Sequence, residues 1–164
     1  SIAKECISIS LSDKELQLQG ATEEEILIQR IFSKNLSNIK HIKHNSKTFN
    51  FSSIGKFDFI FIDGDHSYKG VKNDTENAFK VLKDNNSIIA WHDYSDLTGN
   101  TINWGVLAGI LDGCPKKNLK NLYHVSNTMC LIYINKKFNV KDIPSLIPNK
   151  TFTMNLSLKE FKNQ

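Results

Sequence analysis

Two stretches of the chain decide the fold: Phe57-Asp-Phe-Ile-Phe-Ile-Asp-Gly-Asp-His-Ser-Tyr68 and Ser87-Ile-Ile-Ala-Trp-His-Asp-Tyr94. Each is a short apolar run that ends in acidic and histidine side chains. Apolar residues on both faces are typical of strands in a parallel sheet that helices cover on each side. The polar residues that follow are costly to bury without partners, so they indicate a site at the carboxyl edge of the sheet, where open α/β sheets bind ligands.

The remaining elements predict one α/β domain over 1–140. In chain order we expect a strand at 6–11, a loop at 13–20, a helix at 22–36, strands at 39–44 and 57–62, a helix at 68–83, a strand at 87–91, a helix at 101–111 and an antiparallel pair at 122–126 and 129–135. The helix at 22–36 follows a capping-box pattern, and its apolar residues recur at helical spacing. We expect 141–164 to be an extension packed on the surface.

The length and composition fit one domain with an ordinary core. The 21 basic and 17 acidic residues leave a net charge of +4. The lysines are scattered and form no basic stripe, so we expect no nucleic-acid partner. No apolar run has the length of a membrane span. Three cysteines without a Cys-x-x-Cys pair disfavour zinc and disulfide frameworks, so we expect a cytoplasmic protein. Homo-oligomer formation stays open.

The strand ends offer hard oxygen ligands beside imidazoles. Asp63 and Asp93 are 30 residues apart, the length of a βαβ unit, so both carboxylates should lie at one edge of the sheet. Together with Asp65, two residues after Asp63, and with His92, they form a donor set that suits Mg²⁺ or Mn²⁺, which would lower the pKa of a substrate hydroxyl. His66 could take the proton as general base. Structural alternatives stay open for each residue, such as a helix cap at Asp63 or a core position for His92.

The same residues resemble a known family. The run 58–68, a helix carrying Asp74, and the run 88–94 are similar to class I S-adenosylmethionine-dependent methyltransferases, nearest to the branch of macrocin-type O-methyltransferases and their cephalosporin-hydroxylase relatives. The resemblance implies a Rossmann-like, mostly parallel sheet with a C-terminal antiparallel pair. It implies metal ligands at Asp63, His92 and Asp93, a catalytic histidine at His66, and a hydroxylated small-molecule acceptor, such as a sugar.

The cofactor side departs from this family. The resemblance places cofactor contacts at Ser10, Asn45, Ser46 and Asp63, yet Ser10 stands where relatives have an acidic residue for the ribose hydroxyls. A serine cannot accept a bidentate pair of hydrogen bonds. The family's first strand and its glycine-rich loop would precede Ser1. Without that central strand we expect a split sheet with unpaired edges, and a 164-residue piece that is inactive alone.

Two other classes of function stay open beside this one. Asp63-Gly-Asp65 is an Asp-x-Asp pattern that also occurs in metal-dependent glycosyltransferases and phosphohydrolases. A methyltransferase-like domain without catalysis is the third class of function. Gly105, Gly109 and Gly113 follow no strand, so we interpret them as close-packing positions in a helix. The aromatic residues Tyr68, Trp91, Tyr94 and Trp104 are compatible with a substrate pocket or with core packing.

Overall fold

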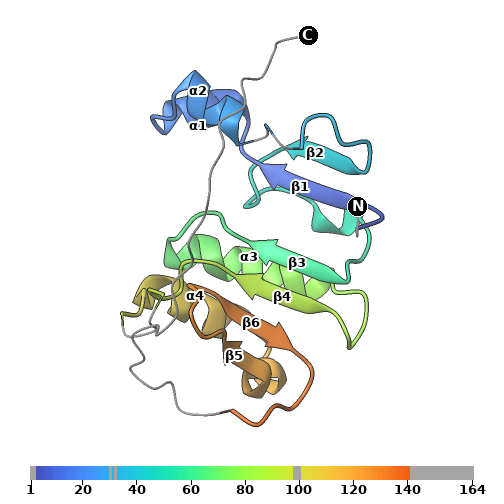
Figure 1. The fold of residues 1–164 in the computed structure, drawn as a ribbon, viewed down its shortest axis with the longest axis vertical. Helices are drawn as coiled ribbons and strands as arrows, with labels where there is room; N and C mark the ends of the chain where they lie inside the picture. Colours follow the sequence, from blue (N-terminus) through green and yellow to red (C-terminus); the bar gives the residue numbers. More distant parts are fainter. Residues whose placement is uncertain (1–2, 30, 32, 98–100, 141–164) are drawn as a thin grey trace, which may run out of the picture.

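The computed structural model describes residues 3–29, 31, 33–97 and 101–140, and Figure 1 shows its course. Strands and helices alternate through most of the chain. Their bounds are β1 Cys6–Ser10, α1 Asp13–Leu18, α2 Glu23–Ile28, β2 Ile39–Lys43, η1 Phe51–Ser53, β3 Phe59–Ile62, α3 Tyr68–Lys80, β4 Ile88–Trp91, α4 Trp104–Gly113, η2 Lys116–Asn121, β5 Leu122–His124 and β6 Leu131–Ile134.

The strands form two sheets rather than one. β1 pairs with β2 in parallel, and a second sheet has the order β3-β4-β6-β5. In that sheet β3 and β4 are parallel, whereas β6 runs antiparallel to β4 and to β5. The prediction of a Rossmann-like α/β chain with a parallel part and a C-terminal antiparallel pair is confirmed. β1 and β3 lie next to one another and point the same way, but no pairing joins them in the described part of the chain (Figure 1).

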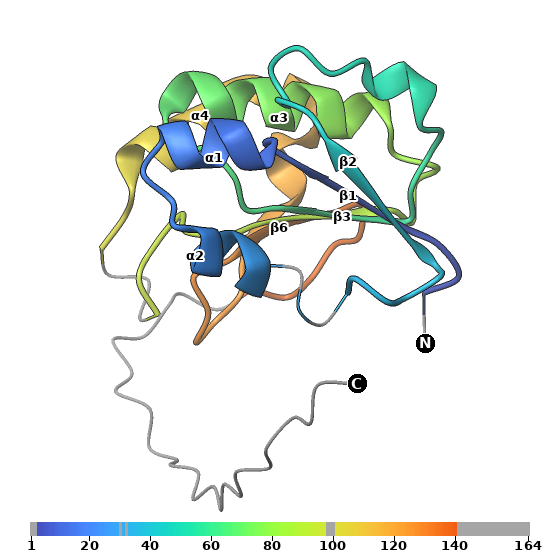
Figure 2. The same ribbon diagram turned by 90° about the horizontal axis from the view of Figure 1, so that it is seen from above.

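The core lies between the four-stranded sheet and one layer of helices. Helices α3 and α4 pack together on the same side of this sheet (Figure 2). Their apolar residues Val71, Val106 and Ile110 meet Ile89 and Trp91 of β4, and all five are at most 4% exposed. This layer fixes the position of β4, and therefore of the polar residues that follow it.

Two of the three glycines expected at close-packing positions, Gly109 and Gly113, let α3 and α4 approach closely, whereas the expectation is wrong for Gly105, which has only ordinary contacts. A Cβ atom on Gly109 would lie 2.8 Å from Cβ of Val71, and one on Gly113 would lie 2.7 Å from Cβ of Thr75. Real Cβ atoms do not come so near to another heavy atom. Gly109 and Gly113 are thus helix-packing positions and not part of a cofactor loop.

The expected loop at 13–20 is wrong, because residues 13–18 form α1. Ser12 caps this helix: its side chain accepts a hydrogen bond from the Glu15 N–H, and the Glu15 carboxylate accepts from the Ser12 N–H. This is the same capping box that Thr22 and Glu25 form at α2. The pattern Ser-x-x-Glu was present in the sequence, but the polar residues after it concealed the helix. The helix predicted at 22–36 ends at Ile28.

The expectation that β3 is covered on both faces is also wrong for the described residues. Phe59 and Phe61 are 59% and 52% exposed, whereas Ile60 and Ile62 pack against the core. Alternate side chains of a strand point to opposite faces, so only the face toward α3 is covered. The surface extension predicted at 141–164 lies outside the described residues.

Candidate functional site

The candidate site lies where β3 and β4 end. Ile62 is paired with Trp91 in this parallel pair, so Asp63 comes out of the sheet beside His92. The chain then turns back over this edge before α3 begins, which brings His66 to the same place. The predicted convergence of polar residues at the carboxyl edge is therefore present in the structure.

Four side chains form the cluster, and Asp93 is at its centre. Its Oδ2 lies 2.8 Å from Nδ1 of His92 and 3.1 Å from Nε2 of His66. Asp63 Oδ1 is 3.7 Å from Nδ1 of His92 and 4.0 Å from Nε2 of His66. The Asp93 side chain is only 20% exposed, while that of His66 is half exposed. A carboxylate that touches two imidazoles can fix both rings, and His66 keeps access to solvent.

The backbone at Asp93 is in the left-handed region, with φ of 57°. Aspartate tolerates this conformation better than most residues, but at some cost in free energy. The turn directs the Asp93 carboxylate back between the two histidines. A strained residue that holds the centre of a polar cluster is typical of a functional site.

The side chains of the cluster include a group that could hold a divalent cation. One ligand atom each from Asp63, His66 and Asp93 can lie within 4.8 Å of one another. Nδ1 of His92 is buried, and among the described residues it has no well-aligned hydrogen-bond partner, although both carboxylates are near. A buried nitrogen of this kind is costly unless a ligand satisfies it. Two carboxylates with imidazole nitrogen are an accepted donor set for Mg²⁺ or Mn²⁺.

Asp65 has a structural environment outside this cluster. Its carboxylate accepts hydrogen bonds from the Ser67 N–H at 2.8 Å and from Nζ of Lys47 at 2.7 Å. The Lys47 ammonium first, and the Ser67 N–H next, lower the pKa of Asp65. Asp65 thus shapes the loop before α3 and ties it to the loop after β2. The role of Lys47 could not be predicted from the sequence, because its contact with Asp65 depends on tertiary structure.

Asp74 is the other supporting carboxylate. Asn73 donates a hydrogen bond to it at 3.0 Å, and the Ser46 hydroxyl is a further partner. Burial raises the pKa of Asp74 above its ordinary value, and these hydrogen bonds oppose the rise. Asn73 also donates to the Ser46 carbonyl at 3.3 Å. The loop after β2 is therefore attached to α3.

The four positions expected to contact a cofactor lie at strand ends. Ser10 ends β1, and its carbonyl accepts a hydrogen bond from the His44 N–H at 2.8 Å. Asn45 and Ser46 follow β2, and Asp63 follows β3. Asn45 Oδ1 accepts from the Lys47 N–H at 3.0 Å. Their contact with a nucleoside stays a prediction, and none of the three from the first two strands has the carboxylate typical of a ribose site.

The aromatic residues divide into two groups. Trp91 and Tyr94 are 1% and 4% exposed and belong to the core. Tyr68 donates a hydrogen bond to Asp112 at 2.7 Å. Trp104, at the start of α4, is 73% exposed, and the adjacent Gly105 packs near the backbone of His66. Trp104 is the most exposed of these four aromatic side chains.

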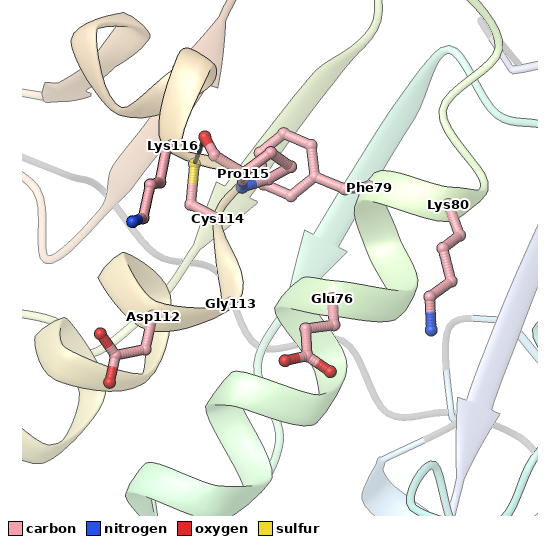
Figure 3. Close-up of a pocket in the computed structure, with 8 residues that line it drawn as sticks. All are labelled: Glu76, Phe79, Lys80, Asp112, Gly113, Cys114, Pro115 and Lys116. Atoms are coloured by element: carbon pink, nitrogen blue, oxygen red, sulfur yellow. Dashed lines mark hydrogen bonds between the residues drawn. The ribbon is translucent and has the colours of Figure 1, made fainter.

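A hollow of about 480 Å³ lies elsewhere, between the C-terminal part of α3 and the end of α4. Figure 3 shows its lining by Glu76, Phe79 and Lys80 on one side and by 112–116 on the other. The Cys114 thiol points toward the Pro115 carbonyl, and burial raises its pKa to about 11. The thiol is therefore protonated near neutral pH and a weak nucleophile. The hollow is wide open and contains none of the cluster residues.

No helix of the described residues has the length and apolar character needed to cross a membrane.

Comparison with known proteins identifies a family model described as a methyltransferase domain, which matches residues 3–94, more than half of the chain. A search of curated proteins finds no match. Among solved structures, the chain is similar to the crystal structure of the N-methyltransferase NodS from Bradyrhizobium japonicum WM9. The two share 14% identity over 79% of this chain and 83% of the other, with a TM-score of 0.42.

Proposed function

Because this chain belongs to the methyltransferase-domain family whose model it matches, we propose that it is an S-adenosylmethionine-dependent enzyme that methylates a hydroxyl group of a small molecule. The observation that supports O-methylation is the cluster of Asp63, His66, His92 and Asp93. A hydroxyl is a weak nucleophile until its proton is removed, and this cluster contains both a base and a cation-binding donor set.

His66 accepts the hydroxyl proton in this proposal. Its Nε2 faces Asp93, so an Nε2–H directed at that carboxylate leaves Nδ1 free to accept the proton. Asp93 holds the ring and stabilises the imidazolium that forms. The half-exposed ring can then return the proton to water. S-adenosylmethionine, when bound, would supply a methyl group from its positively charged sulfur, with the S–C bond breaking as the C–O bond to the acceptor forms.

Asp63, His92 and Asp93 are the proposed ligands of Mg²⁺ or Mn²⁺, which when bound would lower the pKa of the acceptor hydroxyl. The buried Nδ1 of His92 near both carboxylates supports this choice. His66 is an alternative ligand with the same two carboxylates. The two assignments predict opposite behaviour for variants of the two histidines.

Manganese binding to the full chain, measured by electron paramagnetic resonance, separates these assignments. We expect His92→Ala to abolish Mn²⁺ binding, whereas His66→Ala keeps it and lowers methyl transfer roughly 10²–10⁴-fold. The matched control is His44→Ala, since His44 is exposed and lies outside the cluster. Loss of Mn²⁺ binding in His66→Ala with full binding in His92→Ala would contradict the proposed roles.

The Asp-x-Asp alternative receives less support, because Asp65 is engaged with Lys47 and Ser67 rather than with Asp63. Calorimetry with S-adenosylhomocysteine and with a nucleotide sugar decides between the two enzyme classes. Binding of the nucleotide sugar alone would overturn the methyltransferase proposal for this site. Binding of neither compound fits a methyltransferase-like domain without catalysis and equally the inactive 164-residue piece expected from the sequence.

A further inference from the structure

The left-handed turn at Asp93 depends on the residues that flank it. Its φ of 57° is one of two positive values at non-glycine residues in the described part of the chain, the other being at Asn127. A residue persists in such a conformation only where the surrounding structure holds it there. The position of the central carboxylate in the cluster is therefore set by contacts on either side of Asp93.

The sheet fixes the residue before the turn. The His92 N–H donates a hydrogen bond to the Ile62 carbonyl at 3.0 Å, and β4 is paired with β3 on one side and with β6 on the other. Trp91, Leu131 and His124 form one row across β4, β6 and β5. The chain therefore leaves β4 at a defined point, beside the start of β6 and the end of β5.

Two other segments fix the backbone after the turn. The Tyr94 N–H donates to the Met129 carbonyl at 3.3 Å, and the Tyr94 carbonyl accepts from the Asn103 N–H at 2.9 Å. Met129 belongs to the connection between β5 and β6, and Asn103 is the N-cap of α4. Both backbone polar groups of Tyr94 are thus hydrogen-bonded.

The Tyr94 side chain adds a third attachment. It is 4% exposed, and its hydroxyl lies 2.7 Å from Nδ1 of His124, with the two rings edge to face at 5.6 Å. Burial lowers the pKa of His124, so its imidazole is neutral at pH 7 and Nδ1 can accept the hydroxyl proton. This hydrogen bond connects the residue after Asp93 to β5.

The contact between Tyr94 and His124 has a cost. Nε2 of His124 is buried, and within the described ranges it has no hydrogen-bond partner. A buried nitrogen without a partner lowers stability, and an apolar pair of similar shape would avoid this loss. A polar contact that is present despite its cost favours a role in positioning over a role in stability.

One peptide bond joins Tyr94 to Asp93, so few torsions separate their side chains. Because the peptide unit is planar, rotation between the two α-carbons is confined to ψ of Asp93 and φ of Tyr94. A Tyr94 residue that is held by its backbone and by its ring restricts both torsions. The Asp93 carboxylate then stays 2.8 Å from Nδ1 of His92 and 3.1 Å from Nε2 of His66.

From these observations we propose that Tyr94 and His124 are positioning residues of the candidate site. Their hydrogen bond holds the left-handed turn at Asp93 and thereby keeps its carboxylate between His66 and His92. These roles rest on the proposed function, in which Asp93 is a cation ligand and holds the base. Both residues act through Asp93 and need no contact with cation or acceptor.

A pair of tyrosine variants of the full chain tests these roles. Tyr94→Phe keeps the ring in the core but removes the hydroxyl. Tyr123→Phe is the matched control, because Tyr123 precedes His124 on β5 and its hydroxyl donates to the Lys136 carbonyl at 2.9 Å. Each variant loses one hydroxyl hydrogen bond, but only the first loses the contact with His124.

Nuclear magnetic resonance of the imidazole nitrogens is the first measurement, because it needs neither cofactor nor substrate. We expect the signals of His66 Nε2 and His92 Nδ1 to shift in Tyr94→Phe, since both atoms lie within 3.1 Å of the Asp93 carboxylate. Tyr123→Phe should keep the wild-type signals. Unchanged signals in Tyr94→Phe, or equal shifts in the two variants, would overturn the proposal. The amides of Ile89 and Ile132 report whether the core remains folded.

The affinity for Mn²⁺ is the second measurement. Loss of one buried hydrogen bond should weaken Mn²⁺ binding about three- to tenfold in Tyr94→Phe and leave it unchanged in Tyr123→Phe. Equal affinities of Tyr94→Phe and wild type would contradict the positioning role. A wild-type chain that binds no Mn²⁺ would refute the metal part of the proposed function, and the imidazole signals would still decide the roles of Tyr94 and His124.

Variants of His124 separate positioning from simple packing. His124→Asn keeps an acceptor near the place of Nδ1, whereas His124→Leu fills the space without one. We expect the asparagine variant to keep the wild-type imidazole signals of His66 and His92, and the leucine variant to reproduce those of Tyr94→Phe. Identical signals in the two His124 variants would refute the role of the hydrogen bond.

Discussion

At the scale of the residue, aspartates of this protein have different environments although their side chains are the same. Asp63 and Asp93 belong to the histidine cluster, Asp65 is paired with Lys47, and Asp74, on α3, is partly buried beside the loop after β2. All four are aspartates within one stretch of sequence, yet the pKa of Asp65 is lowered whereas that of Asp74 is raised. The difference arises because the neighbours of each carboxylate come from other parts of the chain.

Asp74 gives a prediction about pH. Burial raises its pKa in the folded state. Above that pKa the ionised carboxylate is less stable in the folded protein than in the unfolded chain, and this difference lowers the free energy of unfolding. We expect Asp74→Asn to increase the free energy of unfolding at pH 7. The gain should fall as the pH drops through the folded-state pKa, and should vanish below the unfolded value of about 3.9.

Urea unfolding of wild type and Asp74→Asn at several pH values from 3 to 8 measures this effect. Asp84→Asn is a suitable control, because Asp84 is exposed in the loop after α3. A gain that stays constant across this range would show that the change acts through packing and not through the charge.

The buried hydroxyl of Thr75 gives a second prediction. It accepts a hydrogen bond from Nε1 of Trp91 at 2.9 Å, and Thr75 is fully buried. Thr75→Val keeps the shape but leaves the indole N–H unsatisfied, which should cost about 1–3 kcal/mol of stability. Thr75→Ser keeps the acceptor. We expect the Trp91 indole proton to exchange rapidly in the valine variant and slowly in the serine variant; slow exchange in both would contradict this account.

At the scale of the element, the packing of α3 on α4 depends on glycines, which have no side chain. Gly109 and Gly113 lie against Val71 and Thr75, so the interface has no space for a methyl group. Gly105 has only ordinary contacts at 3.6 Å or more around the place of a Cβ atom. The three glycines share one helix and a four-residue spacing, but they differ in what faces them.

This difference gives a matched pair of substitutions. We expect Gly109→Ala to destabilise the protein by about 1–3 kcal/mol through overpacking, despite the better helix propensity of alanine. Gly105→Ala should be neutral or stabilising by up to about 1 kcal/mol, because alanine has a better helix propensity than glycine. Thermal and urea unfolding of both variants measure the two effects. Similar changes of stability in the two variants would contradict the close-packing role.

At the scale of the whole molecule, apolar burial is uneven. The described residues before β3 contain one buried apolar side chain, Ile26, whereas most of the core lies between α3, α4 and the four-stranded sheet. The contacts of Lys47 and Ser46 that connect the two parts are polar, and exposed ion pairs contribute little to stability. The two sheets should therefore differ in their resistance to opening.

Native-state hydrogen exchange measures this difference. We expect amides of β1 and β2 to open with a lower free energy than those of β4 and β6, because local stability follows the apolar area that each unit buries. Low urea concentrations should accelerate exchange in β1 and β2 before the core unfolds globally. Equal opening free energies in both sheets would indicate a single cooperative unit instead.

The sequence by itself determined the strands, and it predicted a polar site at their carboxyl ends. Alternating and continuous apolar runs predicted every strand from β1 to β6, and the polar residues after β3 and β4 predicted the cluster, because strand ends of a βαβ unit meet at one edge. It did not reveal α1, whose few apolar residues give a weak helical pattern. Only the tertiary structure decided three features: the exposure of Phe59 and Phe61, the pairing of Lys47 with Asp65 and the central position of Asp93. Each of them depends on which segments, distant in the sequence, lie next to one another in the fold.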